Sequence, residues 1–134
     1  MKIKIANDSH LLNEISKEVI NALKEKGVDE EIIFDIHVGF EEALRNAMIH
    51  GNKLSSKKVV TIEVEVTEDM VIISVEDQGE GFDPGSLPDP TLDENLLKES
   101  GRGVYLMTHL MDEVVYEKDG RKVIMKKRLN KKHV

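Results

Sequence analysis

The chain has 134 residues, of which 40% are hydrophobic and 34% charged, with a formal net charge of −7 and no cysteine. This length suits one domain, 1–134, with its own core. The absence of cysteine excludes disulfides, thiolate metal ligands and a cysteine nucleophile. No apolar run approaches the ~18 residues of a membrane span or the apolar core of a secretory signal. We therefore expect a cytoplasmic domain with no membrane contact.

Charge is distributed unevenly along the chain. Residues 126–134 hold five lysines and arginines and no acid, so residues 1–125 carry a net charge of −12. Such an acidic body binds a phosphate backbone poorly, and 4% aromatic residues without tryptophan provide little for base stacking. We expect no direct binding of nucleic acid, and we interpret the basic tail, 126–134, as a solvated end of the chain.

The first predicted elements are a short strand and a helix. Residues 2–6 are interpreted as the strand, and Asn7 or Asp8 as the cap of the helix that follows. Gly27 is expected to end this helix. Its apolar residues recur at intervals of three and four, which is typical of an amphipathic helix: Leu12, Ile15, Val19 and Leu23.

A second helix is predicted from Asp29, its N-cap, to Gly51. Gly39 lies inside it and costs up to ~1 kcal/mol relative to alanine, which suggests close packing at that point. The helix again has a continuous apolar stripe, formed by Ile32, Ile36, Phe40, Ala43 and Ala47.

The remaining pattern predicts two antiparallel hairpins. Apolar residues alternate in 60–66 and in 71–75, and a second pair of strands, 113–118 and 122–128, flanks the turn dipeptide Asp119-Gly120. The segment between the hairpins contains all three prolines and five of the nine glycines, which favours a functional loop. The predicted fold is α+β, with a mostly antiparallel sheet covered on one face by helices.

Glu42 and Asn46 form the first candidate constellation. Their spacing of four places both side chains on one line of the second helix, and His50 continues it. A carboxylate and an amide oxygen placed in this way suit a hard cation and a nucleophile, although a merely polar helix face has the same pattern. We expect Glu41 and Arg45, also four apart, to form an exposed salt bridge.

Asp77 is the second candidate. The period of two places it on the same face as the apolar residues of 71–75, where a carboxylate needs hydrogen-bond donors. Gly79 and Gly81 follow and permit close approach of the backbone to a flat ligand. A nucleobase amino group would satisfy Asp77, and an Asx turn is the alternative.

The third candidate is Gly101-Arg102-Gly103, which precedes an apolar helical segment. Glycines at a helix N-terminus present backbone N–H groups to phosphate oxygens. The tripeptide completes neither the P-loop nor the dinucleotide-binding pattern, so it is a weak signal alone.

Taken in order, the three motifs resemble the GHKL (histidine kinase-like) ATPase superfamily. Glu42–Ala47 is similar to its N-box, Asp77–Gly81 to its first glycine box and Gly101–Gly103 to its second. The runs from Glu42 to Asn52 and from Ser100 to Val114 are similar, more narrowly, to the anti-sigma factor serine/threonine-protein kinases of bacterial sporulation and general stress response.

The resemblance implies a Bergerat-type α/β sandwich that binds ATP and Mg²⁺. It implies that Asp77 accepts a hydrogen bond from the adenine amino group, that Asn46 ligates Mg²⁺, and that Glu42 is the catalytic base. It also implies an ATP lid at about 82–100. The glycine boxes contribute the other nucleotide-binding residues: Gly79 and Gly81 at the adenine, and Gly101, Arg102 and Gly103 at the phosphates.

The resemblance further implies a homodimer that phosphorylates a STAS-domain anti-anti-sigma protein and sequesters an RNA polymerase sigma factor. One position departs from the family, since Arg121 replaces the threonine that many relatives carry after the last hairpin glycine. A second hypothesis is therefore a nucleotide-gated binding module without phosphoryl transfer. A detached histidine-kinase catalytic domain ranks third, because the chain lacks a dimerisation helix with a phospho-accepting histidine.

Overall fold

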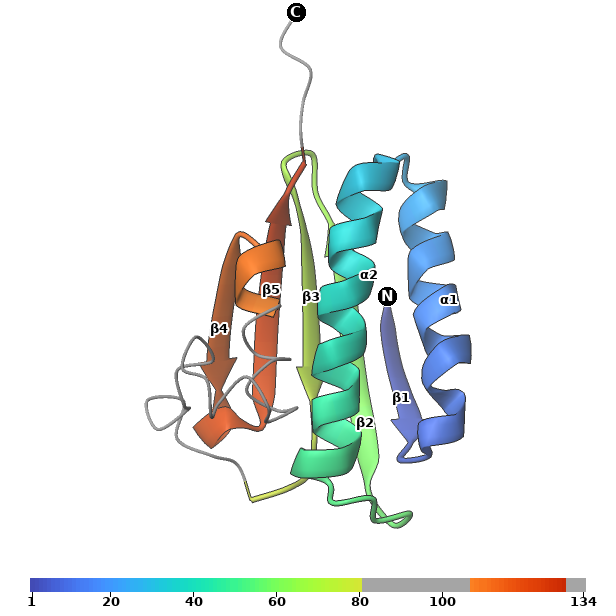
Figure 1. Cartoon of the computed structure of the whole chain (residues 1–134), viewed down its shortest axis with the longest axis vertical. Coiled ribbons are helices and arrows are strands. Elements are labelled where there is room, and N and C mark those ends of the chain that lie inside the picture. The colour runs from blue at the N-terminus through green and yellow to red at the C-terminus, as the bar shows by residue number, and fades with distance from the viewer. Residues whose placement is uncertain (81–106, 130–134) are drawn as a thin grey trace, which may run out of the picture.

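The computed structural model describes residues 1–80 and 107–129. They form a five-stranded antiparallel sheet in the order β1-β2-β3-β5-β4, with two helices side by side across one face (Figure 1). The predicted α+β class and the one-sided helical cover are confirmed. The elements are β1 (Lys2–Ala6), α1 (Leu12–Glu25), α2 (Glu30–Arg45), β2 (Val59–Val66), β3 (Met70–Glu76), β4 (Glu113–Glu117) and β5 (Lys122–Arg128).

Both predicted helices form, and the predicted N-cap of the second, Asp29, is confirmed, whereas the first begins differently from the prediction. Asp8 caps a short 3₁₀ turn (Ser9–Leu11) by accepting a 2.9 Å hydrogen bond from the His10 N–H, and α1 follows without a side-chain cap. Asp29 is the N-cap of α2 but makes no capping hydrogen bond. The close packing expected at Gly39 is confirmed, since a Cβ there would lie 3.3 Å from the Cγ and Sδ of Met111.

The core lies between the helices and the inward side of the sheet. The alternation predicted for the central hairpin is observed, because Val71, Ile73 and Val75 are buried while Ile72 between them is only half-buried. Each fully buried aliphatic side chain contributes about 1.5–3 kcal/mol. The largest fully buried residues come from both layers and include Phe40, Leu23, Ile36, Leu44, Met48, Ile62, Ile73 and Met125.

Two expectations near the C-terminus need correction. The second hairpin does not turn on Asp119-Gly120 alone, because Lys118, Asp119 and Gly120 all have positive φ (53°, 57° and 86°) in a wider loop. Residues 126–128 of the predicted solvated tail are part of β5, and Lys127 is only 15% exposed and lies 3.1 Å from Asp35 of α2. The rest of the tail from residue 130, and the predicted lid at 82–100, lie outside the described residues.

No helix in 1–80 or 107–129 is both long and apolar enough to cross a membrane.

Candidate functional site

Asp77 follows directly on β3 and faces the helical layer, as its register predicts. Its backbone N–H donates a 2.8 Å hydrogen bond to the Arg121 carbonyl, which extends the pairing of β3 with β5 by one residue. Its Oδ1 accepts a 2.8 Å hydrogen bond from the Gly79 N–H, so the predicted alternative, an Asx turn, is present as well. The second carboxylate oxygen has no hydrogen bond from the described residues.

Burial raises the pKa of the Asp77 carboxyl above its ordinary value. The Gly79 N–H bond and the positive charges of Arg121 and Lys58 oppose this shift, while Glu76 adds to it. A half-buried acceptor that has lost part of its hydration gains from a hydrogen-bond donor on a ligand. The electrostatics of Asp77 therefore suit recognition of an amino group.

Two glycines make the cradle in which this carboxylate lies. A Cβ on Gly51 would overlap Oδ2 and Cγ of Asp77, and a Cβ on Gly79 would overlap the carbonyl oxygen of Gly51. Neither glycine has a positive φ, so close approach rather than backbone conformation requires them. The sequence predicted Gly79 as a site residue, whereas Gly51 was recognised only as a helix end.

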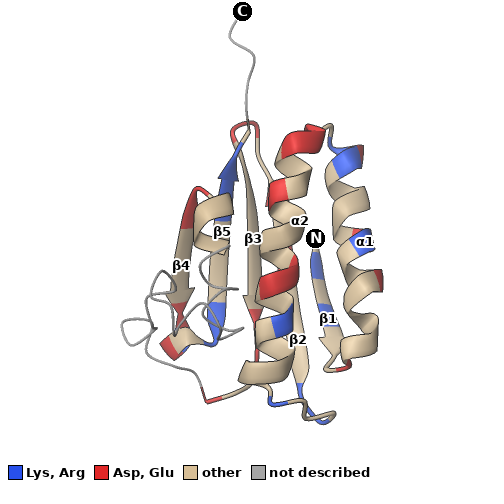
Figure 2. Ribbon diagram, viewed as in Figure 1, with Lys and Arg blue, Asp and Glu red and all other residues tan. Residues whose placement is uncertain are grey.

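Glu42 lies on α2 with only 17% of its side chain exposed. Its Oε1 accepts a 2.7 Å hydrogen bond from Nη1 of Arg45, three residues later. The expected pair of Glu41 with Arg45 is therefore wrong, because Glu41 instead lies 3.3 Å from Nε2 of His37. Arg45 is the single lysine or arginine of α2, which otherwise carries five acidic residues (Figure 2).

Asn46 begins a π-helix, η2 (Asn46–Gly51), that continues α2. Single π-helical turns are frequent at functional sites because they change the direction in which side chains point. The Asn46 side chain is half-exposed and makes no hydrogen bond to the other described residues. Its amide oxygen is a ligand type that suits Mg²⁺. The described residues contain no cluster of three or more acidic, histidine or cysteine side chains that could hold a metal by themselves.

The described part of the chain thus joins two of the predicted motifs. Glu42 and Asn46 lie on one continuous helical run, and the end of that run, Gly51, contacts Asp77. The residues expected at the phosphates, Gly101, Arg102 and Gly103, and Gly81 of the first glycine box lie outside the described residues. The glycine cradle and the unsatisfied carboxylate oxygen fit an adenine nucleotide, and Asn46 fits a metal bound to its phosphates.

Sequence reasoning missed three amide side chains behind the site, Asn7, Asn52 and Gln78. Asn7 and Asn52 are buried and hydrogen-bonded to each other, and Asn52 also accepts from the Gln78 N–H. Each stands at the end of a predicted element, which is a weak signal. Nothing in the sequence pairs residues that are 45 and 26 positions apart.

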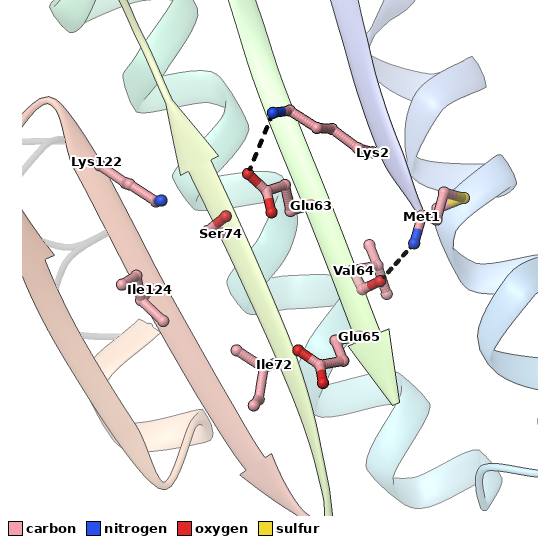
Figure 3. Close-up of a pocket in the computed structure, with 9 residues that line it drawn as sticks. All are labelled: Met1, Lys2, Glu63, Val64, Glu65, Ile72, Ser74, Lys122 and Ile124. Atoms are coloured by element: carbon pink, nitrogen blue, oxygen red, sulfur yellow. Dashed lines mark hydrogen bonds and ion pairs between the residues drawn. The ribbon is translucent and has the colours of Figure 1, made fainter. Parts of the chain in front are cut away.

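A separate hollow lies on the sheet face turned away from α1 and α2 (Figure 3). It contains none of the candidate site residues and combines both signs of charge, with Lys2 lying 3.9 Å from Glu63. The described lining is Met1, Lys2, Glu63, Val64, Glu65, Ile72, Ser74, Lys122 and Ile124.

Comparison with known proteins identifies the family of the chain. Residues 5–127 match the family described as the histidine kinase-like ATPase domain. The chain is 41% identical over 105 residues to the anti-sigma F factor of Clostridium perfringens, covering 75% of each protein. It is 38% identical over 118 residues to the serine-protein kinase RsbW of Bacillus licheniformis, covering 81% of this chain and 72% of that one. RsbW of Staphylococcus aureus is 33% identical over 116 residues, with 81% and 73% covered.

The fold and the matched residues define an ATPase domain of the GHKL type. Within that class, the chain belongs to the family of anti-sigma factor serine/threonine-protein kinases. The family resemblance inferred from the three motifs is confirmed.

Proposed function

We propose that this chain is an anti-sigma factor that uses ATP and Mg²⁺ to phosphorylate a serine of a STAS-domain anti-anti-sigma protein and sequesters a sigma factor. The observation that carries the proposal is the meeting of two motifs: the helical run with Glu42 and Asn46 ends at Gly51, against the carboxylate of Asp77. Family membership supports both parts of the role.

In this proposal each described residue has a distinct task. Asp77 accepts a hydrogen bond from the adenine amino group through its free oxygen, while Gly51 and Gly79, which have no side chain, let the carboxylate lie against the end of η2. Asn46 would ligate Mg²⁺, which when bound neutralises phosphate charge. Phosphoryl transfer depends mainly on such positioning and neutralisation.

Glu42 is the proposed base. It takes the proton from the serine hydroxyl, whose oxygen forms a bond to the γ-phosphorus as the bond to the bridging oxygen breaks and ADP leaves. Arg45 holds Oε1 of Glu42, so Oε2 is the oxygen available for the proton. The low exposure of Glu42 limits competition from water.

Replacing Glu42 by glutamine tests this role. Glu42→Gln retains the shape and an acceptor for Arg45, so ATP affinity should stay as in the wild type while phosphoserine formation on a STAS-domain substrate falls about 10²-fold or more. Glu41→Gln, a neighbouring acid paired with His37, is the control and should transfer normally. Transfer by Glu42→Gln at the wild-type rate would remove Glu42 from the chemistry. ATP binding without phosphoserine in the wild type would favour the binding-module hypothesis.

We also propose that the functional form is a homodimer, in which the sheet face turned away from α1 and α2 forms the contact. Val115 and Ile124 are register partners on this face, and Val115 is 37% exposed. Lysines and glutamates surround them, so the face is complementary to itself in the way that a two-fold interface requires. Ile124→Glu should therefore halve the mass measured by light scattering, and an unchanged mass would exclude this face.

A further inference from the structure

We infer that Asn52 is a positioning residue that fixes the orientation of Asp77 and thereby sets the preference of the site for adenine. The inference rests on the proposed role of Asp77 in base recognition. It concerns a residue that lies behind the site and is fully buried.

Asn52 uses every part of its amide group. Its Oδ1 accepts a 2.7 Å hydrogen bond from the Gln78 N–H. Its Nδ2 donates to the carbonyl oxygen of Val59 at 3.0 Å and to Oδ1 of Asn7 at 3.3 Å. Its own backbone N–H donates to the Ala47 carbonyl at 2.7 Å, inside the π-helix. One side chain therefore joins the end of η2, the start of β2 and the segment after β3.

Asn7 and Gln78 complete this amide network, defined here as Asn7, Asn52 and Gln78. The Asn7 Nδ2 donates to the carbonyl oxygens of Met48 (3.3 Å) and Ser55 (3.1 Å), which holds the π-helix against the end of β1. The Gln78 Oε1 accepts a 2.9 Å hydrogen bond from the Val59 N–H. The network thus holds both the helix that carries Asn46 and the loop that carries Asp77.

Three consecutive backbone N–H groups define the loop at Asp77. The N–H of Asp77 is bonded to the Arg121 carbonyl, that of Gln78 to Asn52, and that of Gly79 to the Asp77 carboxylate itself. The first bond belongs to the sheet and the third lies within the Asx turn. The bond to Asn52 is therefore the hydrogen bond among these three that ties the turn to the helical layer, beside the close packing of Gly51 against Asp77 and Gly79.

The bond between Gln78 and Asn52 affects the discrimination between bases as well as the stability of the fold. A carboxylate distinguishes an amino group from a carbonyl only while its free oxygen points at that group, since the interaction is directional. If the bond to Asn52 is lost, the Asx turn can rotate about its remaining sheet bond, and the carboxylate is no longer aimed at one position. A residue that only supported the fold would change the stability and leave the discrimination between bases unchanged.

The test compares dissociation constants for ATP and for inosine triphosphate, which carries a carbonyl in place of the amino group. Both are measured by calorimetry with Mg²⁺, beside thermal unfolding, on five proteins: the wild type, Asp77→Asn, Asn52→Ala, Gln78→Met and Val19→Ala. Val19 is fully buried in α1, so Val19→Ala is the control for lost stability alone. Gln78 is exposed, so Gln78→Met removes one bond of the network without threatening folding.

The wild type should prefer ATP by about tenfold or more, the effect of one hydrogen bond to a charged group. Asn52→Ala should lose most of this preference and Gln78→Met a smaller part of it, while Val19→Ala melts at a lower temperature with the preference intact. The inference fails alone if Asp77→Asn loses the preference and the two network variants keep it. If Asn52→Ala does not fold, a wild-type preference in Gln78→Met overturns the inference. A wild type without preference refutes the proposed role of Asp77 and the inference together.

Discussion

The substitution Gly51→Ala sets local helix propensity against a tertiary contact. Gly51 ends the π-helix and does not have a positive φ, so alanine fits the backbone there and should by itself stabilise the helical run by about 0.5–1 kcal/mol. The structure predicts the opposite result, because the new Cβ would overlap Oδ2 and Cγ of Asp77 and lie 2.8 Å from Oδ1.

The expected losses of stability and of ATP affinity depend on how far the new Cβ displaces the carboxylate of Asp77. Overpacking of this kind costs about 1–3 kcal/mol, which exceeds the propensity gain. The displaced carboxylate also loses its 2.8 Å bond from the Gly79 N–H and its direction toward a ligand. We therefore expect a free energy of unfolding about 1–2 kcal/mol below that of the wild type. The affinity for ATP should fall about 10- to 150-fold, the value of a hydrogen bond to a charged group.

Calorimetric titration with ATP and thermal unfolding together measure both effects. Gly39→Ala is the matched control on the same helical run. Its Cβ would lie 3.3 Å from the flexible side chain of Met111, which is not one of the candidate site residues. That variant should bind ATP like the wild type. If Gly51→Ala also binds ATP like the wild type, or melts at a higher temperature, the account of the glycine cradle is wrong.

Two further predictions use matched measurements. Because burial raises the pKa of Asp77, the ligand-free folded state holds this proton more tightly than the unfolded chain, so stability is lost as pH rises through the raised pKa. Asp77→Asn should thus gain in melting temperature relative to the wild type as the pH rises from the ordinary aspartate range toward neutrality, and a difference that is constant with pH would contradict this. Lys127, 15% exposed, lies 3.1 Å from Asp35 and donates a 2.6 Å bond to the Leu110 carbonyl, so Lys127→Met should cost about 1–3 kcal/mol in chemical denaturation. Lys126→Met, which breaks only an exposed pair with Glu113, should cost below about 1 kcal/mol. Equal losses of stability in the two variants would contradict the greater contribution expected from Lys127.

The sequence predicted the architecture because each element has a clear period. The alternation in 71–75 specifies which face of β3 is buried, and the same period places Asp77 toward the helices. The apolar stripe of α2 similarly predicts the helix and leaves Glu42 and Asn46 on one helical run. These features depend on neighbouring residues alone, so they can be derived before the structure is known.

Contacts between residues far apart in the sequence, and the choice between competing partners, could not be predicted in this way. Arg45 has acids both three and four residues before it, and spacing does not decide between Glu41 and Glu42; His37 provides the alternative partner for Glu41. The π-helical geometry from Asn46 onward also has no sequence signature in the pattern used. The bonds of Asn52 to Asn7 and Gln78 depend on how β1, η2 and β3 converge, which only the tertiary structure specifies.

Titration of ATP into the wild type and into Asp77→Asn, each with and without Mg²⁺, shows whether Asp77 is part of a nucleotide site. We expect magnesium-dependent binding by the wild type and binding weakened about tenfold or more by Asp77→Asn, a change that keeps the size of the side chain and removes its charge. Binding that is equal in the two proteins, or absent in the wild type at millimolar ATP, would contradict a nucleotide site built around Asp77.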